Sequence, residues 1–139
     1  MDRKHRPTML QRTVMAATGL IALAIAYGGL VNPNGLLEGM QLTASGPAGL
    51  NEIRGQYGGF FLLTALFAGF GAAGYIRPTS VLAYLIVLYG GVFLGRAIHL
   101  LLGGFDELAT YPPAMQAIHL VDLTGLVLSV AAIRQGDRD

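Results

Sequence analysis

The chain has no cysteine and no tryptophan, and it is poor in charged residues. Without cysteine it has no disulfide, no thiolate nucleophile, no thiol redox relay and no cysteine-ligated metal. Charged residues make up 12% of the 139 residues, whereas an average soluble domain is about 25% charged. The formal net charge of +1 gives no electrostatic footprint for nucleic acid. We therefore expect no nucleic-acid partner.

The abundant residues are apolar ones and glycine. Hydrophobic residues make up 53% of the chain, which also contains 20 glycines. Glycine is more frequent in membrane helices than in soluble ones. So few charged side chains cannot cover the surface of a soluble domain of this length. The composition therefore predicts one integral membrane domain over residues 1–139, with the lipid bilayer as its main partner.

Charged residues separate four apolar segments, each long enough to cross a hydrocarbon core of about 30 Å. The expected helices cover residues 13–31, 52–76, 79–102 and 114–133, with an outer loop at 32–51. Gly103 and Gly104 suit the end of the third helix, and Pro112 and Pro113 suit the start of the fourth. The sequence thus predicts an all-α, up-down four-helix membrane bundle.

Basic residues gather on one side of these spans. This side holds seven of the nine lysines and arginines: Arg3, Lys4, Arg6, Arg12, Arg77, Arg134 and Arg138. Acidic residues fall on the other side: Glu38, Glu52, Asp106 and Glu107. Because cytoplasmic loops are enriched in basic residues, we expect both termini in the cytoplasm.

The first apolar segment also has features of a secretory signal. A basic start, an apolar run and the small residues Ala24 and Ala26 occur together. The apolar run nevertheless continues to Val31, which favours an uncleaved membrane helix. Cleavage would leave three spans with an outer N-terminus.

Small residues recur at a spacing of four on several spans, which permits close helix contact in lipid. They are Thr18, Ala22 and Ala26, then Gly55 and Gly59, then Ala65, Gly69 and Ala73, then Gly91 and Gly95. Such faces either pack the bundle itself or bind another membrane protein or a second copy. Both interpretations need the same close approach of backbones.

Four ionisable residues lie inside the predicted spans, where they are costly and face a bundle interior or a wet cavity. They are Arg96, His99, His119 and Asp122. Each helix carries its two members three residues apart, hence on one face. At 1.5 Å per residue, Arg96 and Asp122 lie roughly 9 Å and 12 Å from the outer ends of their helices. Antiparallel neighbours would bring these two level and His99 near His119, and Tyr89 extends the same face inward.

Three interpretations of this cluster remain open. Arg96 and Asp122 form a structural ion pair that fixes helix register, or Arg96, His99 and Tyr89 contact a small, quinone-like ligand. The third interpretation is a metal site that uses His99 and His119 with Asp122 or Glu52, or a haem bound axially by the two histidines. No compact motif such as H-E-x-x-H is present. We expect no cofactor, and no residue is assigned a catalytic role.

A short motif at the start of the second helix adds a resemblance. It comprises Glu52, Arg54, Tyr57, Gly58 and Gly59, accompanied by Gly95 before Arg96 and by Asp122 early in the fourth helix. With these features the chain resembles the bacterial family of small four-helix membrane proteins catalogued as domain of unknown function four-three-four-five, itself distantly similar to DoxX-like proteins. The resemblance implies a multi-pass protein of the bacterial inner membrane and no established activity.

Two functions follow as hypotheses. The first is a non-catalytic accessory or assembly subunit whose polar cluster fixes helix packing. The alternative is a membrane protein that uses the cluster to bind a quinone-like molecule, a metal or haem. Neither function requires catalysis, so the sequence favours a protein that is not an enzyme.

Overall fold

The computed structural model describes residues 6–136, and every regular element within them is a helix. In chain order these are α1 (Met9–Val31), α2 (Pro33–Gly39), α3 (Gly46–Ile53), the π-helix η2 (Arg54–Phe60), α4 (Phe61–Ala72), α5 (Pro78–Gly103), the 3-10 helix η3 (Phe105–Thr110) and α6 (Pro113–Gly136). The predicted all-α class is confirmed for this part of the chain. Arg3, Lys4 and Arg138, used above to predict orientation, lie outside it.

Within residues 6–136, three helical stretches are long and apolar enough to cross a membrane: Met9–Val31, Pro78–Gly103 and Met115–Gly136. They contain the expected helices at 13–31 and 79–102 and most of the one at 114–133. The first begins earlier than expected because Thr8 and Gln11 form a capping box. The Gln11 amide N–H donates to Thr8 Oγ1 at 3.2 Å, and the Thr8 amide N–H donates to Gln11 Oε1 at 3.0 Å.

The second predicted helix differs from the structure. Its expected range was 52–76, whereas the backbone is helical from 46 to 72 through α3, η2 and α4. The π-helix divides this path, so none of its three segments reaches the length of a membrane span on its own. The path ends early because Gly74 takes a left-handed φ of +81°, a conformation that glycine adopts without penalty.

The expected outer loop at 32–51 also differs, since it contains α2 and the first part of α3. Asn32 caps α2 by accepting a hydrogen bond from the Gly35 amide at 3.1 Å, and Pro33 occupies the first turn. Residues typical of turns are equally suited to a helix start, because both need a side-chain acceptor and a fixed backbone angle.

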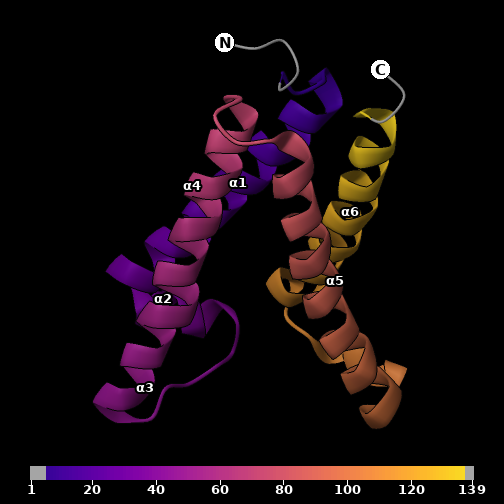
Figure 1. The fold of residues 1–139 in the computed structure, drawn as a ribbon. Coiled ribbons are helices and arrows are strands. Elements are labelled where there is room, and N and C mark those ends of the chain that lie inside the picture. Colours follow the sequence, from indigo (N-terminus) through magenta and orange to yellow (C-terminus); the bar gives the residue numbers. More distant parts are fainter. Residues whose placement is uncertain (1–5, 137–139) are drawn as a thin grey trace.

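The helices of the described chain pack mainly as two pairs (Figure 1). In the first pair, α1 lies against η2 and α4. A β-carbon on Gly29 of α1 would lie 2.5 Å from the Gly58 amide nitrogen of η2, so the two backbones touch where the helices cross. In the second pair, α5 lies against α6, and a β-carbon on Gly125 would lie 2.5 Å from the Tyr89 ring.

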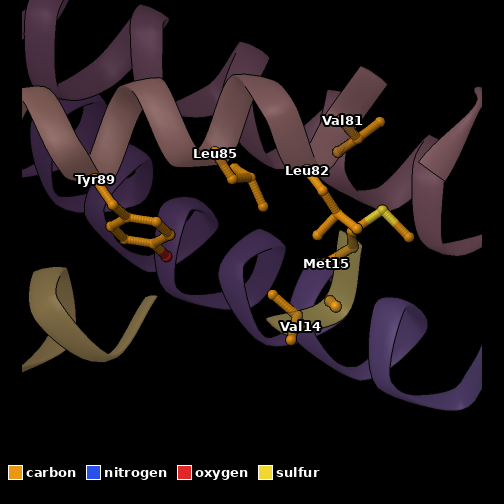
Figure 2. Close-up of a cluster of buried hydrophobic side chains, with 7 residues drawn as sticks. Val14, Met15, Val81, Leu82, Leu85 and Tyr89 are labelled. Carbon is orange, nitrogen blue, oxygen red and sulfur yellow. The ribbon is translucent and has the colours of Figure 1, made fainter. Parts of the chain in front are cut away.

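The two pairs meet near the end of the molecule that holds the turn between α4 and α5. Figure 2 shows Leu82, Leu85 and Tyr89 of α5 pointing toward α1, where Met15 lies close to Leu82. Val81 and Met15 both lie against Gly71 of α4. The buried cluster there comprises Val14, Met15, Val81, Leu82, Leu85, Tyr89 and Ala132. Away from this core the pairs diverge (Figure 1).

Hydrogen bonds join the pairs beside this core. The Thr18 and Tyr89 hydroxyls lie 3.0 Å apart and link α1 to α5. Thr64 Oγ1 donates to the Phe60 carbonyl at 3.0 Å, so it accepts from the Tyr84 hydroxyl at 2.7 Å, which links α4 to α5. Gln11 Nε2 donates to the Ala132 carbonyl at 3.2 Å and links α1 to α6. These bonds satisfy the buried side chains of Gln11, Thr18 and Thr64 where the two pairs hold together.

Candidate functional site

A cavity of about 510 Å³ lies between the two helix pairs. Side chains of α1, α2, η2, α4, α5 and α6 line it, and most are apolar. They include Ile21 and Ile25 on α1, Leu36 on α2, Phe61 on α4, Leu88 and Val92 on α5, and Ile118 and Val121 on α6. Its volume falls within the range of about 300–1,000 Å³ typical of sites for small molecules.

An ion pair stands in the wall of this cavity. Arg96 Nη1 of α5 pairs with Asp122 Oδ2 of α6, and both residues line the cavity. Their side chains are 26% and 10% exposed, so the pair is largely removed from solvent. The structure thus brings together the two formal charges that the sequence places within the spans. Each charge compensates the other in surroundings where a single one would be costly.

A smaller cavity of about 370 Å³, here called the vestibule, adjoins the first. His99 of α5 and His119 of α6 both line it, together with Arg96 and Tyr111. The Nδ1 of His119 lies 2.7 Å from the Met115 carbonyl oxygen. Because a carbonyl only accepts, Nδ1 carries the proton in this bond, which fixes the orientation of the ring. The ring also lies against Tyr111, with centroids 5.7 Å apart.

The described residues offer few ligands for a metal ion. Within residues 6–136, no group of three or more His, Cys, Asp or Glu side chains is placed to hold a metal ion. His99 and His119 share the vestibule, but Asp122 lines the neighbouring cavity. The described arrangement therefore offers two imidazoles without the third protein ligand that a typical metal site uses.

Tyr89 lies at the inner end of the cavity, where the two pairs meet. Its hydroxyl contacts Thr18 and its ring covers Gly125. On the opposite wall, Tyr57 of η2 lines the cavity and stacks on Phe61 with ring centroids 6.2 Å apart. Two tyrosines from different helix pairs thus border the same space.

The motif at the start of the second helix largely coincides with the π-helix η2. Such helices are rare and occur often at functional sites. Tyr57 lines the cavity, and Gly58 forms the backbone contact with α1. Glu52 and Arg54 are exposed and do not line either cavity, and Glu52 contacts Gln56 Nε2 at 3.5 Å. The motif therefore contributes Tyr57 to the cavity wall and Gly58 to the contact with α1. Its charged residues do not line the cavity that Arg96 and Asp122 line.

The remaining glycines of the predicted site have no close neighbour within the described chain. A β-carbon on Gly95 would meet nothing within 4 Å, and one on Gly59 would meet only the Arg54 carbonyl at 3.9 Å. Gly95 still lines the vestibule beside Arg96. Packing within this chain therefore does not explain either residue.

Sequence reasoning missed several cavity residues. Thr64 and Phe61 border the cavity from α4, and Met115 borders both cavities from α6. Thr64 follows Tyr57 by seven residues, the spacing that led from Arg96 to Tyr89, so the same rule of shared helix faces could have found it. No comparable signal marks Met115.

Comparison with known proteins identifies a family without an assigned activity. No curated protein and no solved structure matches the chain. The family described as Domain of unknown function (DUF4345) matches residues 10–112. The match includes the π-helical motif, Tyr89 and Arg96, and it ends before His119 and Asp122. Because this match covers most of its length, the chain belongs to the DUF4345 family.

Proposed function

We propose that this protein is a multi-pass membrane protein that binds an apolar small molecule with a polar group in the cavity between its helix pairs. The observation that carries the proposal is the Arg96–Asp122 pair in the wall of an otherwise apolar cavity of about 510 Å³. A pair that served only helix register would need no cavity beside it. Ligand sites, in contrast, combine apolar walls with a few convergent polar groups.

The proposal includes an orientation in a bacterial inner membrane. The helical path from 46 to 72 serves as a fourth crossing beside α1, α5 and α6, and both termini are cytoplasmic. Supporting it, Arg12, Arg77 and Arg134 all belong to helix ends near the core where the pairs meet. Basic residues favour the cytoplasmic side. The cavity then occupies the outer half of the membrane.

A second candidate is the accessory or assembly subunit, and the exposed glycines favour it. β-carbons on Gly55, Gly69, Gly91 or Gly95 would meet nothing within 4 Å, so these residues are not used for packing inside the described chain. Small residues on a lipid-facing helix permit close contact with a partner helix. This function requires that another membrane protein, or a second copy, co-purifies at fixed stoichiometry.

Filling the cavity tests the binding function. Val92 lines the cavity and is 36% exposed, whereas Val87, on the same helix, is 74% exposed and lines neither the cavity nor the vestibule. We expect Val92→Trp to abolish saturable photolabelling by a ten-carbon alcohol carrying a diazirine in its chain. Val87→Trp, which adds the same bulk elsewhere, should label like the unmodified protein.

The measurement uses the full chain in phosphatidylcholine nanodiscs, with labelled residues identified by mass spectrometry. Mild extraction from native membranes and native mass spectrometry should also show a small molecule retained by the unmodified protein and by Val87→Trp. Equal labelling of both variants, or label confined to lipid-facing positions, would overturn the proposal. Far-UV circular dichroism establishes that each variant is folded.

A further inference from the structure

The cavity and the vestibule adjoin along a shared border. Arg96 lines both, as do Met40, Leu42 and Met115. A single ligand that enters one can therefore extend into the other past Arg96. The side chains that line the two spaces differ, and this difference indicates the chemistry of the ligand.

The vestibule is lined by groups that carry nitrogen and hydroxyl donors. Arg96 brings guanidinium donors, Tyr111 a hydroxyl and Gln41 an amide, and the imidazoles of His99 and His119 border it as well. No Asp or Glu is among the described residues that line the vestibule; Asp122, which pairs with Arg96, borders the cavity instead. The vestibule is therefore suited to an anion, while the cavity beyond it is suited to hydrocarbon.

Arg96 stands where these two environments meet. Asp122 contacts its Nη1 atom, and a guanidinium has five N–H donors in a planar fork. One carboxylate therefore does not exhaust its capacity, and guanidinium forks pair well with carboxylate or phosphate. His119 uses its Nδ1–H for the Met115 carbonyl, so the donors for an anionic group come from Arg96 and not from this ring.

The apolar part of the space is long enough for one alkyl chain. From Leu88 to Arg96, the α5 residues that line it extend about 12 Å along the helix axis. Thr18 to Ile25 on α1 border a similar length on the facing wall. Tyr89 lies at the inner end, against the core where the pairs meet.

We propose that the ligand is a single-chain amphiphile with an anionic head, whose carboxylate or phosphate lies in the vestibule and whose chain lies in the cavity. This inference rests on the proposed binding function and narrows its ligand to one chemical class. Arg96 contacts the head, and the apolar residues of both helix pairs enclose the chain.

A matched pair of probes tests it. Ten-carbon decanoate and decanol, each carrying a diazirine at the same position of the chain, differ only at the head. In phosphatidylcholine nanodiscs, we expect decanoate to saturate labelling of the cavity at a concentration at least tenfold lower than decanol. Excess acetate should not displace decanoate, because a free carboxylate lacks the chain; displacement by acetate would mean a site for free anions and would overturn the proposal.

A double variant tests whether the charges of Arg96 and Asp122 bind the anionic head, without leaving one buried charge alone in the fold. Arg96→Gln with Asp122→Asn removes both charges while keeping two side chains that hydrogen-bond, so no buried charge is left unpaired. We expect both probes to saturate labelling of this variant at the same concentration. For decanol, that concentration should equal the one measured with the unmodified protein. Equal saturation in the unmodified protein, or a decanoate preference that persists in the double variant, would refute the anionic head. Failure of the binding function is distinct: neither probe would label the cavity, or Val92→Trp would leave labelling unchanged.

Discussion

At Gly29 the backbone of α1 touches the backbone of η2, and no side chain fits between them. A β-carbon there would lie 2.5 Å from the Gly58 nitrogen, and one on Gly58 would lie 2.6 Å from Leu30 Cδ2. Gly95 on α5 is the opposite case, since a β-carbon there meets nothing within 4 Å. Identical residues thus serve close packing at one position and leave open space at another.

This contrast predicts opposite effects of the same substitution. Gly29→Ala should destabilise the protein by about 1–3 kcal/mol, because the rigid backbone of η2 has to move. Gly95→Ala should be neutral or stabilise by up to about 1 kcal/mol, because alanine is the better helix former. Thermal unfolding in detergent, followed by far-UV circular dichroism, measures both. A Gly29→Ala protein that melts with or above Gly95→Ala would contradict the crossing described here.

At the scale of the element, Gln11 ties the start of α1 to the end of α6. Its side chain accepts from the Thr8 amide and donates to the Ala132 carbonyl, and the residue is 4% exposed. The first bond caps its own helix, while the second joins two helices 121 residues apart in sequence. One side chain therefore links local and tertiary structure.

Three substitutions should separate these contributions. Thr8→Ala removes only the local cap and should cost about 1 kcal/mol. Gln11→Ala also removes the bond to α6 and leaves the Ala132 carbonyl without that donor, so it should cost about 1–2 kcal/mol more. Gln11→Glu keeps the acceptor for Thr8 and loses the donor, and it should resemble Gln11→Ala. Chemical unfolding in mixed micelles measures all three, and a Thr8→Ala cost equal to that of Gln11→Ala would count against the link to α6.

The sequence predicted α1, α5 and α6 well because their signals are local. Charges mark the ends of each apolar run, and Pro78 and Pro113 lie at helix starts. The π-helix and α2 escaped prediction for a physical reason. The π-helical segment RGQYGGF contains three glycines and carries no apolar stripe whose phase could reveal the extra residues per turn. Asn32 with Pro33 suits a turn as well as a helix start.

The candidate site was predictable in part. Helix rise and antiparallel packing were enough to place Arg96 level with Asp122, because both residues lie on regular helices. The cavity was not predictable, because it depends on which small residues actually meet. The spacing of Gly55, Gly69 and Gly91 predicted close helix contacts. The crossing of α1 and η2 instead uses Gly29 and Gly58. The spacing of small residues shows that two helices can approach closely, but it does not determine which helices do so.

At the scale of the whole molecule, the described part of the chain joins its two helix pairs mainly at one end. The buried cluster and the Thr18–Tyr89, Thr64–Tyr84 and Gln11–Ala132 bonds all lie toward the end with the turn between α4 and α5. The cavity and vestibule lie between the diverging halves. Orientation in the membrane therefore decides which leaflet borders the cavity.

The absence of cysteine makes this orientation measurable, since any introduced thiol is the only one. Ser45, Tyr75 and Gln135 are exposed and belong to different connections or ends. We expect a membrane-impermeant maleimide to label Ser45→Cys in intact spheroplasts, and to label Tyr75→Cys and Gln135→Cys only after the membrane is permeabilised. The reverse pattern would invert the proposed topology, and Ser45 on the same side as Gln135 would contradict a fourth crossing between 46 and 72.

The divergence of the two helix pairs gives the molecule a wedge shape, narrow at the core and broad at the end with α3 and η3 (Figure 1). A wedge within a bilayer displaces unequal areas of the two leaflets. Lateral pressure from lipids in the leaflet at the broad end acts to push the pairs together, and a molecule held between them resists that push. If the cavity is occupied in a membrane as proposed, its occupancy and the packing of the surrounding lipid are mechanically coupled.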